Sequence, residues 1–472
     1  MRYPTALRIG CLCTLLAGPM YAADNTDSTP TANQPADATA QADTQASQPT
    51  SFWDDMAQRE YLLGDAWGAR PTLEELGLSL DISFAMNIAG NAVGGNNQGV
   101  TQVNSTGVNF GVDFEKLADV DGLTFFASMA YRSGTSLTQR HIHNIVSVQQ
   151  LYGNQTYRLV NLYAQQTFLN DTMAIKAGRI AQFDDFSITP SFSFYMNNGF
   201  DGQPVGFFFM GPFTAYPVTT WGALVSGGAA TGDQDGFYGK LGAYGADSDL
   251  GNPDNHGTNF SFNFDQGANI MGEIGYKRNW TDDTTGHPGK YSIGGWVFTG
   301  PFQKNLGGTT DNIGGIYYMF EQNVFREGRN MAEPNSTRLE DRQVWGSDQS
   351  FMDVVQGLYV WSSGQLNLSD EAYQSDFFVS GGAYYRGLFP GRDQDILAFG
   401  AAWLNFSDSY SQSQQSIGQG APDYELELEL GYRYQVTEYF YVQPNIQGII
   451  NPGGTHQLDD ALVIGLQLQV DF

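Results

Sequence analysis

The stretch Glu425–Tyr434 reads ELELELGYRY, and its large apolar residues fall on every second position. Because successive side chains of a β-strand point to opposite faces, such a strand has one apolar face and one polar face. The polar face here carries three glutamates and an arginine. The same alternation recurs in LSLDISFAMN at 78–87 and in LVIGLQLQVDF at 462–472, so strands of this type occur near both ends of the chain.

Two architectures fit this alternation, a soluble β-sandwich with one buried face and a membrane barrel with a wet interior. Three glutamates in line with an arginine favour a second face that meets water, as a pore lumen does. The chain also ends on Phe472, in an apolar-faced strand, which resembles the terminal signal that barrel-assembly machinery reads. At roughly 25 residues per strand and connection, about 400 residues give about 16 strands. The sequence therefore predicts an all-β fold, a transmembrane antiparallel β-barrel of about 16 strands.

The composition is unusual for a soluble globule, with 57 Gly, 32 Phe, 25 Tyr and 8 Trp beside only 15% charged residues. Past the first residues there is no run of about 18 apolar residues, which excludes the helical way of crossing a bilayer. A closed barrel instead spreads its apolar residues over alternate positions. The formal net charge of −28 excludes nonspecific binding of nucleic acid and would bias a pore toward cations.

The first residues have the pattern of an export signal, because two arginines precede an apolar core at 9–17 and a small-residue exit that ends at Ala22. Both cysteines, Cys11 and Cys13, lie inside this predicted signal. The exported chain is therefore expected to hold no thiol for a disulfide, a metal site or a nucleophile. The predicted location is the outer membrane of a Gram-negative bacterium.

Four segments are expected along the chain. Residues 1–22 are the signal peptide, and residues 23–51 are a low-complexity tail, rich in Ala, Thr, Gln and Asp, that predicts disorder. Residues 52–66 have apolar residues at helical spacing and predict a short periplasmic helix. Residues 67–472 form the predicted barrel.

From Trp67 onward the chain resembles the carbohydrate-selective porins of the OprB type. The resemblance rests on the order of short motifs, each of which is weak alone. These motifs are WGAR (67–70), GG (94–95), GR (178–179) before Phe186, YPV (216–218) before WG (221–222), EIGY (273–276), PGKY (288–291) with GGW (294–296), GLFPGRD (387–393), and QPNIQ (443–447) with NPGG (451–454).

The resemblance implies a 16-stranded barrel whose loops fold inward and narrow the channel. It also implies passive diffusion of monosaccharides or similar small polar solutes. The tail and an insertion-like stretch from Arg326 to Asp348 depart from the family pattern. The net charge suggests an alternative function, a general cation-preferring porin on the same barrel.

A sugar-selective constriction needs flat aromatic surfaces for the apolar face of a ring, and charged groups that replace its water. Trp221 and Trp296 are candidates for stacking, with a place in the girdles at the membrane interface as the alternative. Charged candidates come from strand parity, and the alternative for each is an ordinary wall residue paired in an ion ladder. The charged candidates are Arg132, Glu273, Arg386, Glu425, Glu427, Glu429 and Arg433.

Arg179 is a further candidate. It shares its parity with Ile175 and Ala177, which points it toward lipid if the strand continues that far. We expect the strand to end earlier. The resemblance implies a long loop after this point, so Arg179 is predicted to face the constriction.

No catalytic residue is predicted, since the five histidines fall among turn or loop residues and no Gly-x-Ser-x-Gly motif is present. His141 and His143 lack a third metal ligand at suitable spacing. The acidic clusters at 233–235 and 247–254 lack the full spacing of a calcium loop, and solvated loops explain them more simply. We expect no cofactor and no metal. The expected partners are sugars as transported solutes, outer-membrane lipid and barrel-assembly machinery, with a homo-oligomer left open.

Overall fold

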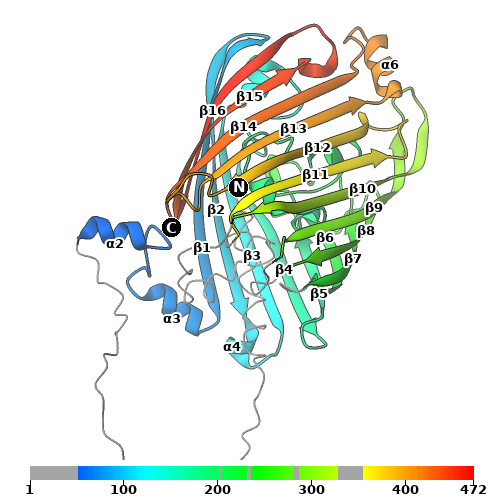
Figure 1. Ribbon diagram of the computed structural model, residues 1–472. Helices are drawn as coiled ribbons and strands as arrows, with labels where there is room; N and C mark the ends of the chain where they lie inside the picture. Colours follow the sequence, from blue (N-terminus) through cyan, green and yellow to red (C-terminus); the bar gives the residue numbers. More distant parts are fainter. Residues whose placement is uncertain (1–50, 201–203, 231–234, 280–285, 328–354) are drawn as a thin grey trace, which may run out of the picture.

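The structure is a computed structural model that describes residues 51–200, 204–230, 235–279, 286–327 and 355–472. These residues form a closed antiparallel barrel of sixteen strands in sequence order, in which β1 closes onto β16 (Figure 1). This confirms the predicted fold. The strands are β1 (Leu78–Gly95), β2 (Gly99–Asp113), β3 (Leu123–Gly134), β4 (Tyr157–Phe168), β5 (Met173–Ile180), β6 (Thr220–Gly228), β7 (Gly236–Gly245), β8 (Ala268–Arg278), β9 (Gly289–Gln303), β10 (Thr309–Arg326), β11 (Gly357–Asn367), β12 (Ser375–Arg386), β13 (Ile396–Phe406), β14 (Tyr424–Thr437), β15 (Phe440–Ile450) and β16 (Asp459–Asp471).

Helices are short in the described part of the chain, and none of them is long and apolar enough to cross a membrane. The α-helices are α2 (Phe52–Gln58), α3 (Ala69–Glu75), α4 (Phe114–Ala118) and α6 (Asp408–Ser416). Single turns of other helix types are η1 (Thr138–Ile142), η2 (Gln182–Asp184), η3 (Pro190–Ser193), η4 (Val205–Phe209), η5 (Pro253–Asn255) and η7 (Pro452–Gly454).

The predicted periplasmic segment at 52–66 contains α2, and mostly turns follow before α3. The predicted signal peptide and almost all of the predicted tail lie outside the described residues. So does nearly all of the insertion-like stretch that begins at Arg326.

The barrel has two distinct ends. The terminus end carries the C-terminus together with α2, α3 and α4, and the opposite end carries α6 (Figure 1). We call the second end the loop end, since it holds the long connections at 135–156, 181–219 and 246–267. Long connections are typical of the extracellular side of outer-membrane barrels.

The predicted alternation places one face of each strand outside. In β14 the three glutamates are buried inside the barrel, while Leu430 is exposed on the outer surface. Aromatic residues gather outside near both ends, as in the interface girdles of membrane barrels. At the loop end, the rings of Trp403 and Tyr424 stack with centroids 4.1 Å apart. At the terminus end, the rings of Phe237 and Tyr276 lie 4.8 Å apart.

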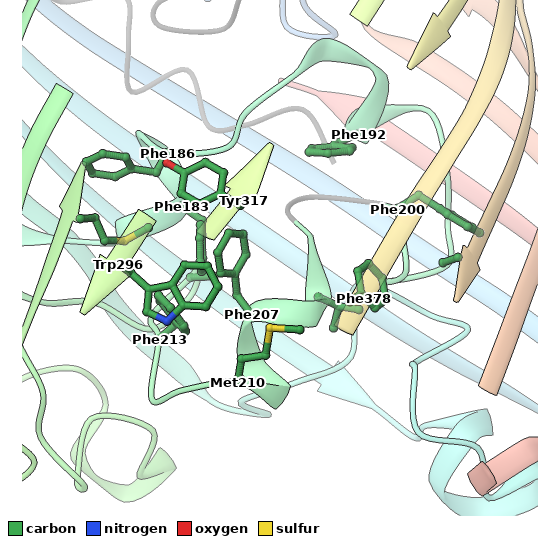
Figure 2. Packing of buried hydrophobic residues seen from close by; sticks show 14 of the residues in the cluster. Phe183, Phe186, Phe192, Phe200, Phe207, Met210, Phe213, Trp296, Tyr317 and Phe378 are labelled. Carbon is green, nitrogen blue, oxygen red and sulfur yellow. The ribbon is translucent and has the colours of Figure 1, made fainter. Parts of the chain in front are cut away.

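A loop fills much of the interior. We call residues 181–219, which connect β5 to β6, the inner loop; its residues 201–203 lie outside the described part. Its phenylalanines pack against the inner faces of β9, β10, β11 and β12, in part as Figure 2 shows. The ring centroid of Phe207 lies 5.1 Å from that of Trp296 and 5.3 Å from that of Tyr317. An apolar core inside the barrel therefore holds the loop that narrows it.

Candidate functional site

Residues 185–197 of the inner loop run along the barrel wall, and we call this segment the strap. Lysines from three strands hold its first half. Lys176 on β5 pairs with the carboxylate of Asp185, with the Nζ–Oδ1 distance at 2.5 Å. Lys240 on β7 donates to the main-chain carbonyl of Asp185 at 2.6 Å, and Lys290 on β9 donates to that of Ile188 at 2.8 Å.

Carboxylates from the neighbouring strands accept main-chain amides of the strap. Glu273 on β8 accepts the amide of Ser187 at 2.9 Å, and it also accepts the hydroxyls of Tyr238 and Tyr317. Glu321 on β10 accepts the amide of Ser191 at 3.2 Å, together with the hydroxyls of Thr189 and Tyr384. Each buried carboxylate is therefore compensated by several donors, as a charge removed from water requires.

The glutamates of β14 hold the end of the strap and a second loop, residues 135–156 between β3 and β4. The hydrogen bonds that their oxygens accept from these two loops measure 2.8–3.2 Å and come from main-chain amides and from two asparagine side chains. Glu429 accepts the amides of Met196 and Asn197, Glu427 accepts the side-chain amides of Asn144 and Asn197, and Glu425 accepts the amides of Ile145 and Val146.

Arg433 and Gln443 complete the attachment of the strap. Arg433 on β14 donates to the main-chain carbonyl of Ser193 and to the Gln443 side chain. Gln443 on β15 donates to the carbonyl of Phe194 at 2.8 Å. The strap is thus bound by side chains from β5, β7, β8, β9, β10, β14 and β15.

Sequence parity correctly places the charged candidates of the strands other than β5 on the inner face, and their contacts differ from one residue to the next. The β14 glutamates and Arg433 bind loop main chain or amide side chains rather than forming an ion ladder. Glu273 binds the Ser187 amide and also forms an ion pair with Lys240 on the neighbouring strand at 3.8 Å, as the alternative interpretation predicts. Hydrogen bonds with one charged partner are about twice as strong as neutral ones. Arg386 ends β12 at the terminus end and is also buried on the inner face.

The two tryptophan candidates lie on opposite sides of the wall. Trp296 is buried inside and packs against the inner loop, as described above. Trp221 lies on the outer face of β6, where its ring stacks on Phe262 at 4.5 Å. It therefore belongs to the aromatic residues at the loop end, which is the alternative interpretation for this residue.

The prediction that Arg179 faces the constriction is wrong. Strand β5 continues to Ile180 and pairs Arg179 with Trp221, so the two side chains share the outer face. Arg179 donates to the main-chain carbonyls of Gly257 and Asn259 at 2.6 and 2.9 Å. A loop covers it from outside, which is why an outward arginine is buried.

A cavity of about 490 Å³ lies between the inner loop, the loop at 135–156 and the loop at 246–267. We call it the mouth cavity, because all three loops connect strands at the loop end. Apolar and polar side chains both line it. The aromatic and apolar lining residues include Tyr152, Val205, Phe208, Phe213 and Tyr216. The polar and charged ones are Arg132, Gln150, Asn154, Asn198, Asp247 and Gln266, among others.

Arg132 and Tyr216 form the best-defined contact of the mouth cavity. Arg132 projects from the inner face of β3, and its guanidinium carbon lies 5.1 Å from the Tyr216 ring centroid. Burial raises the pKa of the Tyr216 hydroxyl, while the neighbouring arginine lowers it less. The hydroxyl is therefore neutral at physiological pH.

The charges of the mouth cavity balance. Among the described residues that line it, Arg132 and Asp247 are the charged ones, and they have opposite signs. This balance contrasts with the net charge of −28 for the whole chain.

Of the residues that line the mouth cavity, sequence reasoning identified Arg132 alone. The other lining residues belong to loops, where strand parity gives no direction. Two signals point to them in retrospect: Tyr216 opens the YPV motif, and Asp247 belongs to the acidic cluster at 247–254.

No group of three or more potential metal ligands occurs in the described part of the chain. Asp249, in the acidic cluster, instead accepts hydrogen bonds from the side-chain amides of Asn252 and Asn255. Asp233 lies outside the described residues.

Comparison with known proteins reveals both a family and its fold. The model of the family described as carbohydrate-selective porin, OprB family, matches residues 97–472. Porin B of Pseudomonas aeruginosa is 26% identical over 437 residues, which cover 88% of this chain and 91% of that protein. The putative porin QuiX of Acinetobacter baylyi is 27% identical over 454 residues, covering 89% and 94%.

A solved structure shares the fold. The high-pH structure of Pseudomonas putida OprB superposes with a TM-score of 0.77 and 22% sequence identity. The match covers 88% of this chain and 99% of the other.

Proposed function

The chain belongs to the OprB family of carbohydrate-selective porins and forms a sugar channel in the outer membrane, and on that premise we propose that the mouth cavity recognises single sugar rings on their way through. The family assignment favours this function over the general cation-preferring porin suggested by the net charge. Membership of a family of channels also supports the expectation that the chain has no catalytic role.

The size and lining of the mouth cavity support the proposal. Its volume of about 490 Å³ falls within the range of small-molecule sites. A sugar ring has one apolar face and a rim of hydroxyls, so it needs an aromatic surface and several hydrogen-bonding groups together. The cavity offers both from three loops at once.

The observation that carries the proposal is the charge balance at the cavity. A channel selective for cations needs a surplus of carboxylates at its narrow part. Arg132 and Asp247 instead give the lining one charge of each sign. Such a lining supplies strong hydrogen-bonding groups without attracting ions of one sign, which suits neutral polyols.

Individual roles follow from the geometry. We assign the Tyr216 ring as the surface on which a sugar ring rests and Arg132 as the donor to its hydroxyls. Asn154 and Asp247, on the facing loops, are assigned as further hydrogen-bonding groups. The charged residues of the wall, including Glu273 and Glu429, act indirectly by holding the strap.

Liposome swelling with glucose, sucrose and an amino acid tests the selectivity, and blockade of single-channel current by added sugar tests the site. Losing the Arg132 contact, worth about 1.5–3 kcal/mol for a charged hydrogen bond, predicts sugar blockade weakened by about tenfold or more in Arg132→Gln. Arg140→Gln is the matched control, because Arg140 is exposed on the loop at 135–156 that follows β3 and does not line the cavity. Equal blockade in both variants would overturn the assignment of Arg132.

We further propose that barrel-assembly machinery recognises the last strand. Strand β16 has an apolar outer face and runs to Asp471, immediately before the terminal aromatic Phe472. Assembly of a Phe472→Ser variant in cells, read as the fraction of heat-modifiable barrel in outer membranes, tests this. Unchanged assembly would refute it.

A further inference from the structure

A row of three phenylalanines lies on the outside of the barrel at the loop end. Phe260, Phe262 and Phe264 belong to the loop at 246–267 between β7 and β8, which we call the rim loop. Their exposed fractions are 45%, 70% and 47%. They alternate with polar residues in the sequence NFSFNFD at 259–265. We call the three side chains the phenylalanine row.

The phenylalanine row crosses three strands on their outer faces. The Phe260 ring centroid lies 5.5 Å from the Arg179 guanidinium on β5, and the Phe262 ring stacks on Trp221 of β6. The Phe264 ring lies directly against Gly245 of β7. A Cβ atom placed at Gly245 would lie 2.6 Å from the ring, so only glycine leaves room for it. Trp221 shares its outward parity with Val225, which is exposed on the same strand.

The polar residues of the same segment bind the protein instead. Arg179 donates to the Asn259 carbonyl at 2.9 Å. Asn263 donates to Asp247 at 3.2 Å, and Asp265 accepts the amide of Ser248 at 2.9 Å. These contacts hold the polar groups of the segment, while its three rings lie against the outer face of the wall and stay partly exposed.

The rim loop passes from the inside of the barrel to the outside. Its first part is held from within, because Arg158 on the inner face of β4 donates to the carbonyls of Leu250 and Asn252. The loop then crosses the edge of β4, where the amide of Leu159 donates to the carbonyl of His256 at 2.9 Å. One loop therefore contributes to the mouth cavity and to the outer surface.

We propose that the phenylalanine row docks into the outer leaflet of the membrane, at the boundary between headgroups and acyl chains. Three observations favour lipid as the occupant. The row continues the barrel's exterior, which is the lipid-facing surface of an outer-membrane protein. Residues 258–264 carry no charge. Aromatic rings backed by polar groups are the side chains that prefer this boundary.

Docking has a consequence for transport that rests on the proposed function. Asp247, Ser248, Leu250, Gly251 and Gln266 of the rim loop line the mouth cavity. With the phenylalanine row held in lipid, the membrane fixes the outer side of a loop whose inner side contacts the sugar. The leaflet then acts as part of the support of the binding site.

A single introduced thiol tests the docking. The chain's cysteines are Cys11 and Cys13, both in the predicted signal, so protein purified from outer membranes is expected to carry only the introduced thiol, as thiol titration checks. Phe262→Cys is labelled with an environment-sensitive fluorophore and reconstituted in phosphatidylcholine vesicles, with and without brominated phosphatidylcholine. Val225→Cys on the outer face of β6 is the lipid-exposed control, and Gln415→Cys on α6 is the water-exposed control.

Docking predicts emission and bromine quenching at 262 close to those at 225, with quenching at least about twofold stronger than at 415. Emission and quenching like those at 415 would overturn the proposal. So would weak quenching at 262 combined with cross-linking between 262 of two copies, which would make the row a protein interface.

Transport separates this proposal from the proposed function. The triple variant F260S/F262S/F264S is compared with Leu241→Ser, which removes one exposed apolar residue from the outer face of β7. Support by the leaflet predicts sugar blockade weakened by about twofold or more in the triple variant alone. Equal sugar blockade in the triple variant and in Leu241→Ser would show that docking does not support the sugar site. It would not contradict the docking itself. Lipid-like emission at 262 with no sugar blockade in the unaltered protein would refute the proposed function and leave the docking intact.

Discussion

Glu429 on β14 accepts the main-chain amide of Asn197 at 2.8 Å, across a sequence separation of 232 residues. The same carboxylate accepts the amide of Met196. This contact closes a series that begins with Lys176 of β5 and Asp185 of the strap. A loop bound at intervals along the inner wall is a fixed part of the channel, so we expect it to narrow the pore permanently rather than to open and close it.

Replacing Glu429 by alanine is expected to loosen the end of the strap. Two buried amides then lose their acceptor, and each unsatisfied donor costs about 1–3 kcal/mol. Hydrogen exchange at Met196 and Asn197 should accelerate, and the open-channel current should become noisier. Glu429→Gln keeps an acceptor oxygen and serves as the control. Unchanged exchange in the alanine variant would show that the strap does not depend on this contact.

Trp296→Ala is expected to destabilise the barrel far more than Trp221→Ala. Trp296 is buried against Phe207 and Phe213, and truncating a buried aromatic typically costs about 3–5 kcal/mol. Trp221 lies on the outer face beneath Phe262 and leaves no internal cavity when truncated. Urea unfolding of both variants in lipid vesicles measures the difference. Similar losses would contradict the inner packing of the loop.

The stability of the inner loop is expected to fall as pH rises from about 4 to about 7. Burial raises the pKa of Asp184 to about 7, with a smaller contribution from Asp185, against the hydrogen bond from Asn161 and the charge of Lys176. A carboxyl with a raised folded-state pKa stabilises the fold fully at pH values below its unfolded pKa, and this contribution disappears as pH rises to about 7.

The measurement is the difference in thermal midpoint between the unaltered protein and Asp184→Asn, from pH 4 to pH 8. The unaltered protein should lose stability relative to the variant over this interval. A difference that stays constant with pH would show that Asp184 does not titrate there.

Arg70→Gln is expected to weaken the junction between the N-terminal segment and the last strand. Arg70 donates to the main-chain oxygen of Phe472 at 2.9 Å, and its guanidinium lies over the Tyr61 ring at 3.8 Å. Arg70 also forms an ion pair with Asp81 on β1 at 3.6 Å, and the loss of these partly exposed contacts suggests a cost of about 1–2 kcal/mol. The temperature at which half of the folded barrel is lost on heat-modifiability gels measures this loss of stability. Arg140→Gln serves as an exposed control. A midpoint equal to that of the control would contradict the role of Arg70.

Strand parity predicted the barrel and the inner face of every charged candidate except Arg179, and chain length, at about 25 residues per strand and connection, predicted the strand number. The parity rule worked for the strands because it depends only on neighbouring residues. At Arg179 the parity itself was right, and the expected early end of β5 was wrong. An outward arginine is unfavourable in lipid, but the rim loop covers this one.

The contacts of the inward charges were beyond sequence reasoning for a different reason. Glu429 and Asn197 come together only after the whole inner loop has folded into the barrel, and no local pattern encodes that pairing. The mouth cavity has the same origin, since Arg132 is its only lining residue that strand parity identified. Resemblance implied inward-folded loops but not which residues they would bring together.

The pairing of β1 with β16 has a consequence for biosynthesis. Partners run from Ser83 with Asp471 to Gly95 with Asp459, so the final residues of the chain form the closing seam. A premature stop codon that removes only this last strand would leave two long unmatched edges instead of a slightly smaller pore. Such shortened chains are predicted to be degraded or to aggregate. A channel therefore forms only when β16 has been synthesised and can pair with β1.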